Sequence, residues 1–206
     1  MKLRNRFGIP APPEKLPPLD ELIKTILSQN TNDRNRDYAF YALKERFPRW
    51  IDILSSAPGE LERIIAPAGL ASKRSRTLRD LLSRIYGGER EDFPDLCAMD
   101  PGQAFQSLVS IKGVGPKTAS CVLLFSCGLP AFPVDTHIHR VTGRLGLLPE
   151  KADRLKAHNI LGNFFSAPHY LEIHLNLIRL GREICRPRNP DCGTCPLNEG
   201  CPAGGG

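Results

Sequence analysis

The sequence lacks any long apolar run. Nowhere in its 206 residues does an apolar stretch approach the roughly 18 residues of a membrane-spanning helix. The first six residues, Met-Lys-Leu-Arg-Asn-Arg, also lack the apolar segment of a secretory signal peptide. We therefore expect a cytoplasmic protein with no membrane partner.

Alternation typical of β-strands is missing as well, and no internal repeat is present. Apolar residues instead recur at helical spacing in segments separated by short turns. This pattern predicts an all-α fold. The expected helices lie at residues 19–27, 38–47, 61–65, 78–85, 101–109, 116–125, 135–145, 151–164 and 168–182.

The first 18 residues contain five prolines. Proline has no N–H to donate and breaks helices, so we expect residues 1–18 to form an extended arm. Asp20 follows this arm and precedes an apolar periodic segment. It is therefore expected to act as the N-cap of the first helix. Asp100, directly before Pro101, is expected to cap a later helix in the same way.

The charge and cysteine content narrow the function. There are 28 Lys and Arg residues against 22 Asp and Glu residues, and this net charge of +6 favours a polyanionic partner.

The cysteine count of seven is odd, which excludes a fully paired disulfide set. In a reducing compartment, clustered cysteines more often bind metal. Cys97, Cys121 and Cys127 are scattered and are expected to be core thiols.

Two glycines, Gly113 and Gly115, connect two apolar helical segments within residues 108–119. Glycine leaves backbone N–H groups accessible, and these groups, with the positive end of the next helix, form a seat for a phosphate. A helix connection without a ligand is the alternative. With apolar helices on both sides, the segment resembles a helix-hairpin-helix, an element that binds the DNA backbone independently of sequence.

Lys117 and Asp135 each lie at the start of an expected helix. A cation is unfavourable at the N-terminal end of a helix dipole, and partial burial further favours the neutral amine. A neutral amine is what Schiff-base formation requires. A solvated Lys on a phosphate is the alternative for Lys117, and a plain N-cap is the alternative for Asp135. Their closeness in the sequence allows the amine and the carboxylate to face one cleft.

Four cysteines gather near the C-terminal end, at Cys185, Cys192, Cys195 and Cys201. Prolines and glycines fill the intervals, so unligated thiols would leave nothing to order the segment. Four thiolates in one loop can ligate Zn²⁺ or an iron–sulfur cluster, and the spacing alone does not choose between them. Arg186 and Arg188 project from the same loop, either to phosphates or to solvent.

Three of these motifs together resemble endonuclease III, a family of the helix-hairpin-helix DNA glycosylase superfamily. They are the Gly-Val-Gly-Pro-Lys-Thr-Ala segment at 113–119, the Val-Asp-Thr-His-Ile segment at 134–138, and the cysteine spacing. Their order and separation agree from Leu19 to Cys201. Three independent motifs in register make chance a poor explanation.

The resemblance implies an all-α, two-domain fold. A helical barrel domain would span residues 19–128, with the hairpin at 108–119. An iron–sulfur cluster domain would join residues 1–18 to 129–206, with a [4Fe–4S] cluster held by the four cysteines of loop 185–201. The implied partner is double-stranded DNA with a damaged base or abasic site, bound by a monomer. In a prokaryote the protein would then be associated with the nucleoid.

The implied activity is that of a bifunctional DNA glycosylase and apurinic/apyrimidinic lyase. An oxidised pyrimidine is flipped out, because its sugar carbon cannot be reached inside the stack. Lys117 attacks C1′ and displaces the base. Asp135 stabilises the developing oxocarbenium charge and helps to deprotonate Lys117. The resulting Schiff base makes the 2′ proton acidic, and β-elimination breaks the 3′ phosphodiester.

The resemblance also implies DNA contacts at Gly113, Gly115, Arg182, Arg186 and Arg188. The family's gap-filling amide falls on Gln29 or Asn30, and the longer Gln29 is favoured because it reaches further into the stack. A C-cap role is the alternative for both. Leu70 matches an intercalating wedge, with a hydrophobic contact after a glycine C-cap as an equal alternative.

Departures from the family pattern leave the lesion preference open. Pro116 stands where the family usually has a basic residue, and Val109 stands where some members carry a pocket carboxylate. One competing hypothesis is a monofunctional mismatch or adenine glycosylase, which Lys117 argues against. Another is a non-catalytic, DNA-binding iron–sulfur protein, which the retained Lys117 and Asp135 argue against.

Overall fold

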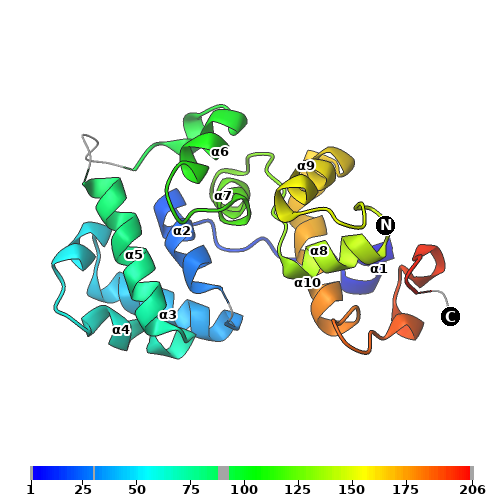
Figure 1. Cartoon of the computed structure of the whole chain (residues 1–206), viewed down its shortest axis with the longest axis horizontal. Helices are drawn as coiled ribbons and strands as arrows, with labels where there is room; N and C mark the ends of the chain where they lie inside the picture. Colours follow the sequence, from blue (N-terminus) through cyan, green and yellow to red (C-terminus); the bar gives the residue numbers. More distant parts are fainter. Residues whose placement is uncertain (1, 30, 88–92, 205–206) are drawn as a thin grey trace. The chain divides into compact units, whose positions relative to one another are not determined.

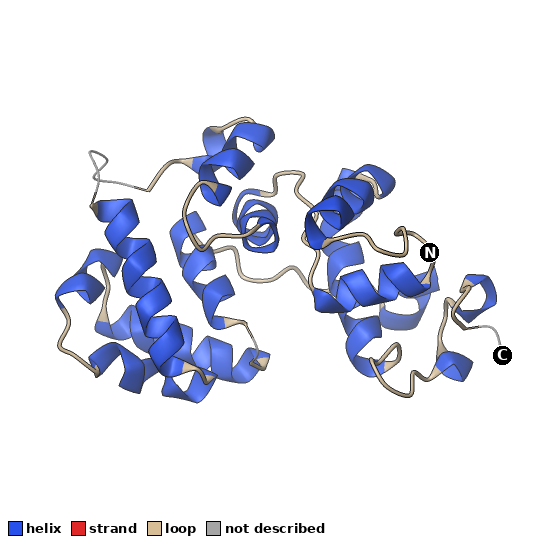
Figure 2. Cartoon of the chain, viewed as in Figure 1, coloured by secondary structure: helices blue, strands red, loops and turns tan. Residues whose placement is uncertain are grey.

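The computed structural model describes residues 2–29, 31–87 and 93–204. Within these ranges all regular structure is helical (Figures 1 and 2), which confirms the all-α prediction. No helix in the described part of the chain is both long and apolar enough to cross a bilayer. The chain divides into two compact units, Leu16–Cys127 and Met1–Lys15 together with Gly128–Gly206.

The Leu16–Cys127 unit is built around α2. Eight of the ten residues of this helix are buried, and it packs against α3, α5 and α7. The helices of the unit are α2 (Pro18–Leu27), α3 (Asp33–Arg46), α4 (Glu60–Ile65), α5 (Ala71–Tyr86), α6 (Pro101–Val109) and α7 (Pro116–Val122). Short helical turns lie at Trp50–Ser55, Ala66–Ala68 and Leu96–Ala98, and a π-helical turn, Leu123–Cys127, continues α7.

Asp20 does not cap α2, so that prediction is wrong. The N-cap is Pro17, and Asp20 lies inside the first turn, where it is buried. The Trp50 Nε1–H donates to Asp20 Oδ1 at 2.6 Å, and Lys44 Nζ lies 2.9 Å from Oδ2. These partners are 30 and 24 residues away in sequence, so local pattern could not reveal them.

The second unit contains α1 and the helices after residue 128. Its helices are α1 (Lys2–Phe7), α8 (Thr136–Arg144), α9 (Arg154–Phe164) and α10 (Tyr170–Glu183). Short turns lie at Ala167–His169, Cys192–Thr194 and Asn198–Gly200. α10 packs against both α8 and α1.

Helix α1 contradicts the prediction that all of residues 1–18 are extended. The prolines begin only at Pro10, so nothing breaks the helix before Gly8. Arg4 donates to both carboxylate oxygens of Glu172 on α10, at 2.8 and 2.5 Å, and the guanidinium of Arg179 lies 4.9 Å from the ring centre of Phe7. Contacts with a helix distant in sequence therefore stabilise this short element.

Two of the three expected core thiols are instead joined in a disulfide. Cys97 and Cys127 are bonded across a sequence separation of 30 residues. Cys97 lies on the turn Leu96–Ala98, which packs against the π-helical turn that ends at Cys127. Sequence spacing could not indicate this pairing, because it depends on the packing of these two turns. Cys121 is buried, as expected.

Candidate functional site

The hairpin between α6 and α7 is a tight turn closed by its own backbone. The Ile111 N–H donates to Leu108 O at 3.1 Å, and the Val114 N–H donates to Ile111 O at 2.9 Å. Gly113 has a φ of 99°, which favours glycine. Gly115 has an ordinary φ of −88°, and a Cβ built on it would meet no atom within 4 Å. Neither the backbone conformation nor a neighbouring atom of the chain requires glycine at position 115. The space beside Gly115 is open, so an external group could approach its backbone closely.

Lys117 is half-buried in the first turn of α7, which packs along α2. Glu21 on α2 is buried, and this burial raises the pKa of its carboxyl. A hydrogen bond from Thr25 and the charges of Lys24, Arg36 and Lys117 act in the opposite direction. The amine of Lys117 therefore lies within electrostatic range of a buried carboxyl. The sequence pattern did not single out Glu21, because α2 also carries Asp20 and Lys24 and an acid in its first turn is ordinary.

Asp135 is the N-cap of α8. Its Oδ1 accepts a hydrogen bond from the Ile138 N–H at 2.8 Å, and the side chain is half-buried. This bond holds the carboxylate in one orientation at the positive end of the helix. Lys117 belongs to the Leu16–Cys127 unit and Asp135 to the other unit. Their joint action stays a prediction.

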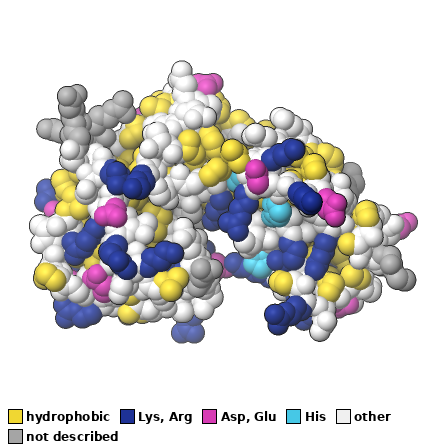
Figure 3. Space-filling model, in the orientation of Figure 1, with side chains coloured by type: hydrophobic (Ala, Val, Ile, Leu, Met, Phe, Trp, Pro, Cys, Tyr) yellow, Lys and Arg dark blue, Asp and Glu magenta, His cyan; other side chains and the backbone are white. Residues whose placement is uncertain are grey.

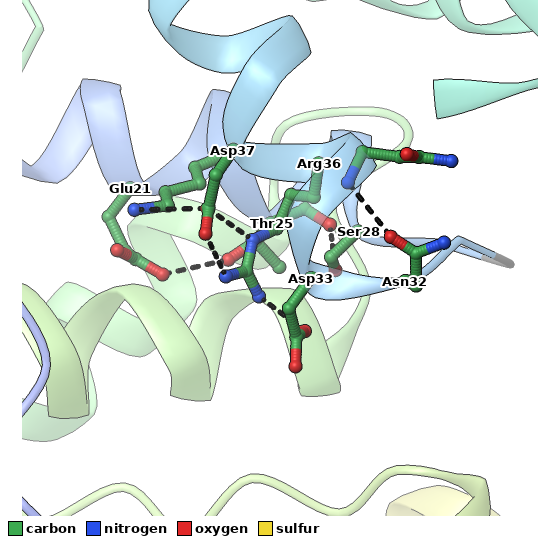
Figure 4. A network of polar contacts seen from close by, with 9 residues as sticks. Glu21, Thr25, Ser28, Asn32, Asp33, Arg36 and Asp37 are labelled. Atoms are coloured by element: carbon green, nitrogen blue, oxygen red, sulfur yellow. Dashed lines mark hydrogen bonds and ion pairs between the residues drawn. The ribbon is translucent and has the colours of Figure 1, made fainter. Parts of the chain in front are cut away.

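A polar network holds the segment between α2 and α3 (Figure 4). Ser28 Oγ donates to Thr25 O at 2.6 Å at the end of α2. Asn32 Oδ1 accepts from the Asn35 N–H at 2.8 Å and caps α3. Thr25 in turn donates to the buried Glu21 at 3.1 Å. Both ends of this connecting loop are therefore fixed by hydrogen bonds.

The residues predicted to enter the DNA stack, Gln29 or Asn30 and Leu70, lie on separate loops. We call these two positions the candidate tips. Gln29 is exposed, while Asn30 lies outside the described residues. Leu70 follows Gly69, is 55% exposed and has a φ of 50°. A positive φ is uncommon for a residue other than glycine. The exposed side chain is accessible to a partner, and the wedge role of Leu70 stays a prediction.

Basic side chains are present on the surface of both units. On the visible face of the Leu16–Cys127 unit, Lys and Arg residues lie among a few carboxylates (Figure 3). In the other unit Arg182, Arg186 and Arg188 are exposed, and Arg186 also donates to Asn189 O at 3.2 Å.

The four clustered cysteines line a single cavity of about 160 Å³. Arg144 of α8 holds one side of it. Its guanidinium donates to Cys185 Sγ at 3.3 Å, to Arg186 O at 2.7 Å and to Pro187 O at 3.0 Å. Burial raises the pKa of the Cys195 thiol, and the nearby cysteines add to this.

The thiols that line the cavity are the ligands that an iron–sulfur cluster takes. Cys185, Cys192, Cys195 and Cys201 are not joined in disulfides, so all four can serve as thiolate ligands.

The family comparison decides the identity. Residues 23–166 match the model described as HhH-GPD superfamily base excision DNA repair protein. The chain belongs to this superfamily. Residues 185–201 match the iron–sulfur binding domain of endonuclease III. The cofactor is a [4Fe–4S] cluster, and the four cysteines that line the cavity are the residues that would hold it.

Individual superfamily members agree over most of the chain. A protein of Arabidopsis thaliana named as a putative DNA glycosylase is 37% identical over 81% of this chain, which spans 57% of that protein's length. Endonuclease III of Thermotoga maritima is 30% identical over 89% of this chain and 82% of its own. A trapped endonuclease III–DNA covalent intermediate has a TM-score of 0.83, with 26% identity, and covers 98% of this chain and 92% of that one.

Proposed function

We propose that this chain is a bifunctional DNA glycosylase and abasic-site lyase of the endonuclease III type, which excises oxidised pyrimidines in base excision repair. The observation that carries the proposal is Lys117, a half-buried amine directly after a hairpin with an open glycine turn. The similarity to an endonuclease III caught as a covalent DNA intermediate supports the same chemistry in this chain.

In the proposed reaction, Lys117 Nζ forms a bond to C1′ while the bond from C1′ to the base breaks. The base leaves with its electron pair and takes up a proton. Asp135 stabilises positive charge at the sugar and accepts a proton from Lys117. Opening of the sugar ring gives an iminium, loss of a 2′ proton follows, and the C3′–O3′ bond breaks with the phosphate as leaving group.

DNA binding is assigned to groups of both units. The open turn at Gly113 and Gly115 would receive a backbone phosphate through its N–H groups. Gln29 or Asn30 and Leu70 would fill the space left by the flipped nucleotide. Arg182, Arg186 and Arg188 would contact phosphates. In this proposal the Leu16–Cys127 unit is the helical barrel domain, the other unit is the iron–sulfur domain, and the protein acts as a monomer.

Borohydride trapping tests the proposal. The wild type is incubated with an oligonucleotide containing thymine glycol or an abasic site, and borohydride reduces any Schiff base to a stable adduct. We expect an adduct with the wild type and none with Lys117→Ala. Lys112→Ala is the matched control, because Lys112 is an exposed lysine of the same hairpin, and it should still give the adduct.

Other outcomes would redirect the assignment. Base release without an adduct would indicate a monofunctional glycosylase. Binding to lesion DNA without base release or strand cleavage would indicate a non-catalytic DNA-binding protein. An adduct that persists in Lys117→Ala would contradict the role given to Lys117.

A further inference from the structure

Arg74 is a buried cation on α5 that the proposed reaction does not use. It is only 4% exposed and lies four residues before Leu78, on the same helical stripe as the buried apolar residues of α5. Burial lowers the pKa of its guanidinium from the ordinary value. A guanidinium in such a place must find hydrogen-bond acceptors to offset the loss of water.

The acceptors are three backbone carbonyls on two different loops. Nη1 donates to Ala68 O and Gly69 O, and Nη2 donates to Gln29 O. Ala68 ends a helical turn, and Gln29 follows the end of α2. Carbonyls at helix C-termini lack intrahelical donors and carry partial negative charge, so a cation there is favourable.

These two loops carry both candidate tips for the DNA stack. Gln29 accepts from one nitrogen of Arg74, and the residue just before Leu70 accepts from the other. One planar group therefore sets the spacing between the two backbones. Arg74 also donates to the carbonyl of Gly69, directly before Leu70. The φ of Leu70 is 50°, a conformation that is unfavourable for a residue other than glycine.

We propose that Arg74 is a positioning residue that holds the Gln29 loop and Leu70 at one spacing, so that both tips enter the DNA stack together. This inference rests on the proposed function. Lysine at position 74 would keep the charge but lose the planar fork, because an ammonium is a compact point charge that cannot span both loops in the same way.

Arg79 provides a matched control on the same helix. Its guanidinium donates to Ile53 O and to Ser56 Oγ, both at 2.8 Å. These acceptors belong to neither of the two loops. A loss of stability common to Arg74→Lys and Arg79→Lys therefore reports the general cost of replacing an arginine that binds loop carbonyls.

The experiment uses DNA with a stable abasic-site analogue opposite 2-aminopurine, whose fluorescence rises when it is unstacked. We expect both variants to melt at a lower temperature than the wild type. Only Arg74→Lys should lose the fluorescence rise and lower the preference for the abasic analogue over undamaged DNA. The expected reduction is about tenfold, the effect of losing one hydrogen bond to a charged group. Equal preference and fluorescence in the two folded variants would overturn the inference.

A second measurement covers the case in which Arg74→Lys does not fold. In an otherwise wild-type chain, Gln29→Ala and Leu70→Ala are made singly and together. If Arg74 couples Gln29 and Leu70, the two substitutions are not independent. The fold-loss of affinity for the abasic analogue in the double variant is then smaller than the product of the fold-losses in the two single variants. A loss equal to that product would overturn the inference. A wild type without preference for abasic DNA would instead contradict the proposed function.

Discussion

Three buried charged residues make contacts that tie separate segments of the Leu16–Cys127 unit together or alter its stability. Asp20 and Glu21 on α2 and Arg74 on α5 are charged residues at buried positions. Asp20 is paired with Lys44 and Trp50. The Nη1 and Nη2 atoms of Arg74 donate to loop carbonyls, whereas its buried Nε has no hydrogen-bond partner among the described residues. Glu21 differs from them, because desolvation outweighs its hydrogen bond and the surrounding positive charges.

This imbalance at Glu21 predicts a pH-dependent stability. The ordinary pKa is 4.5, and burial raises it in the folded protein. Between the two values the folded state binds more protons than the unfolded state, so stability falls as pH rises. Glu21→Gln keeps an oxygen for Thr25 but never ionises. We expect it to be more stable than the wild type at pH 8, with a smaller difference at pH 4, as measured by urea unfolding.

Asp80→Asn is the control for this prediction, because Asp80 is an exposed carboxylate on α5. It should show no comparable gain at pH 8. A wild type that is more stable than Glu21→Gln at pH 8 would mean that the positive charges outweigh burial.

At the scale of elements, contacts distant in sequence fix short segments that have little stability of their own. Helix α1 has six residues and is held by α10 through Arg4 and Arg179. Isolated helices of this length are unstable in water. The turn Leu96–Ala98 is similarly tied to the end of the π-helical turn by the disulfide between Cys97 and Cys127.

Removal of the disulfide should lower the free energy of unfolding. In the chain-entropy model, a crosslink across 30 residues contributes about 3–4 kcal/mol. We expect Cys97→Ser to lose this amount in denaturant titrations without reductant and to match the wild type when dithiothreitol is present. Cys121→Ser, in the buried core, should be destabilised to the same extent in both conditions. A difference between Cys97→Ser and the wild type that persists in reductant would contradict this account.

At the scale of the whole molecule, the metal site and the bulk of the buried core are separate. The Leu16–Cys127 unit contains no cluster ligand and has its own core around α2. In the other unit, α8 and α10 pack against each other, and Arg144 near the end of α8 bonds the start of the cysteine loop. The cluster is therefore expected to order a local loop that carries Arg186 and Arg188, and most of the fold should not depend on it.

Replacing two ligands tests this separation. We expect Cys192→Ser with Cys195→Ser to lose iron and visible absorbance but to keep most of the far-ultraviolet helical signal. Limited proteolysis should then cut within residues 185–201. The slope of log affinity for DNA against log salt should fall by about one for each phosphate that the loop no longer binds, up to about two. Thr194→Ala, in the same loop, should retain the cluster. A general loss of helix, or a colourless zinc protein, would contradict the prediction.

The sequence by itself determined the features that depend only on residues within one or two helical turns, namely the helices, one helix cap, the hairpin turn and the cysteine loop. Apolar spacing placed the helices from α2 to α10, and Asp100 caps α6 through the Gly102 N–H at 2.9 Å, as predicted. The hairpin turn at Gly113 and the cysteine spacing were also readable, because a φ of 99° and a ligand loop are local requirements.

Only the tertiary structure decided which distant groups meet. The partners of Asp20, the disulfide of Cys97, and the three carbonyls around Arg74 lie on other elements. Their meeting depends on how helices pack after the chain has folded. A polar residue at a buried position shows in the sequence that a partner must exist, since its desolvation has to be offset. The identity of that partner is set by packing, which a one-dimensional pattern does not encode.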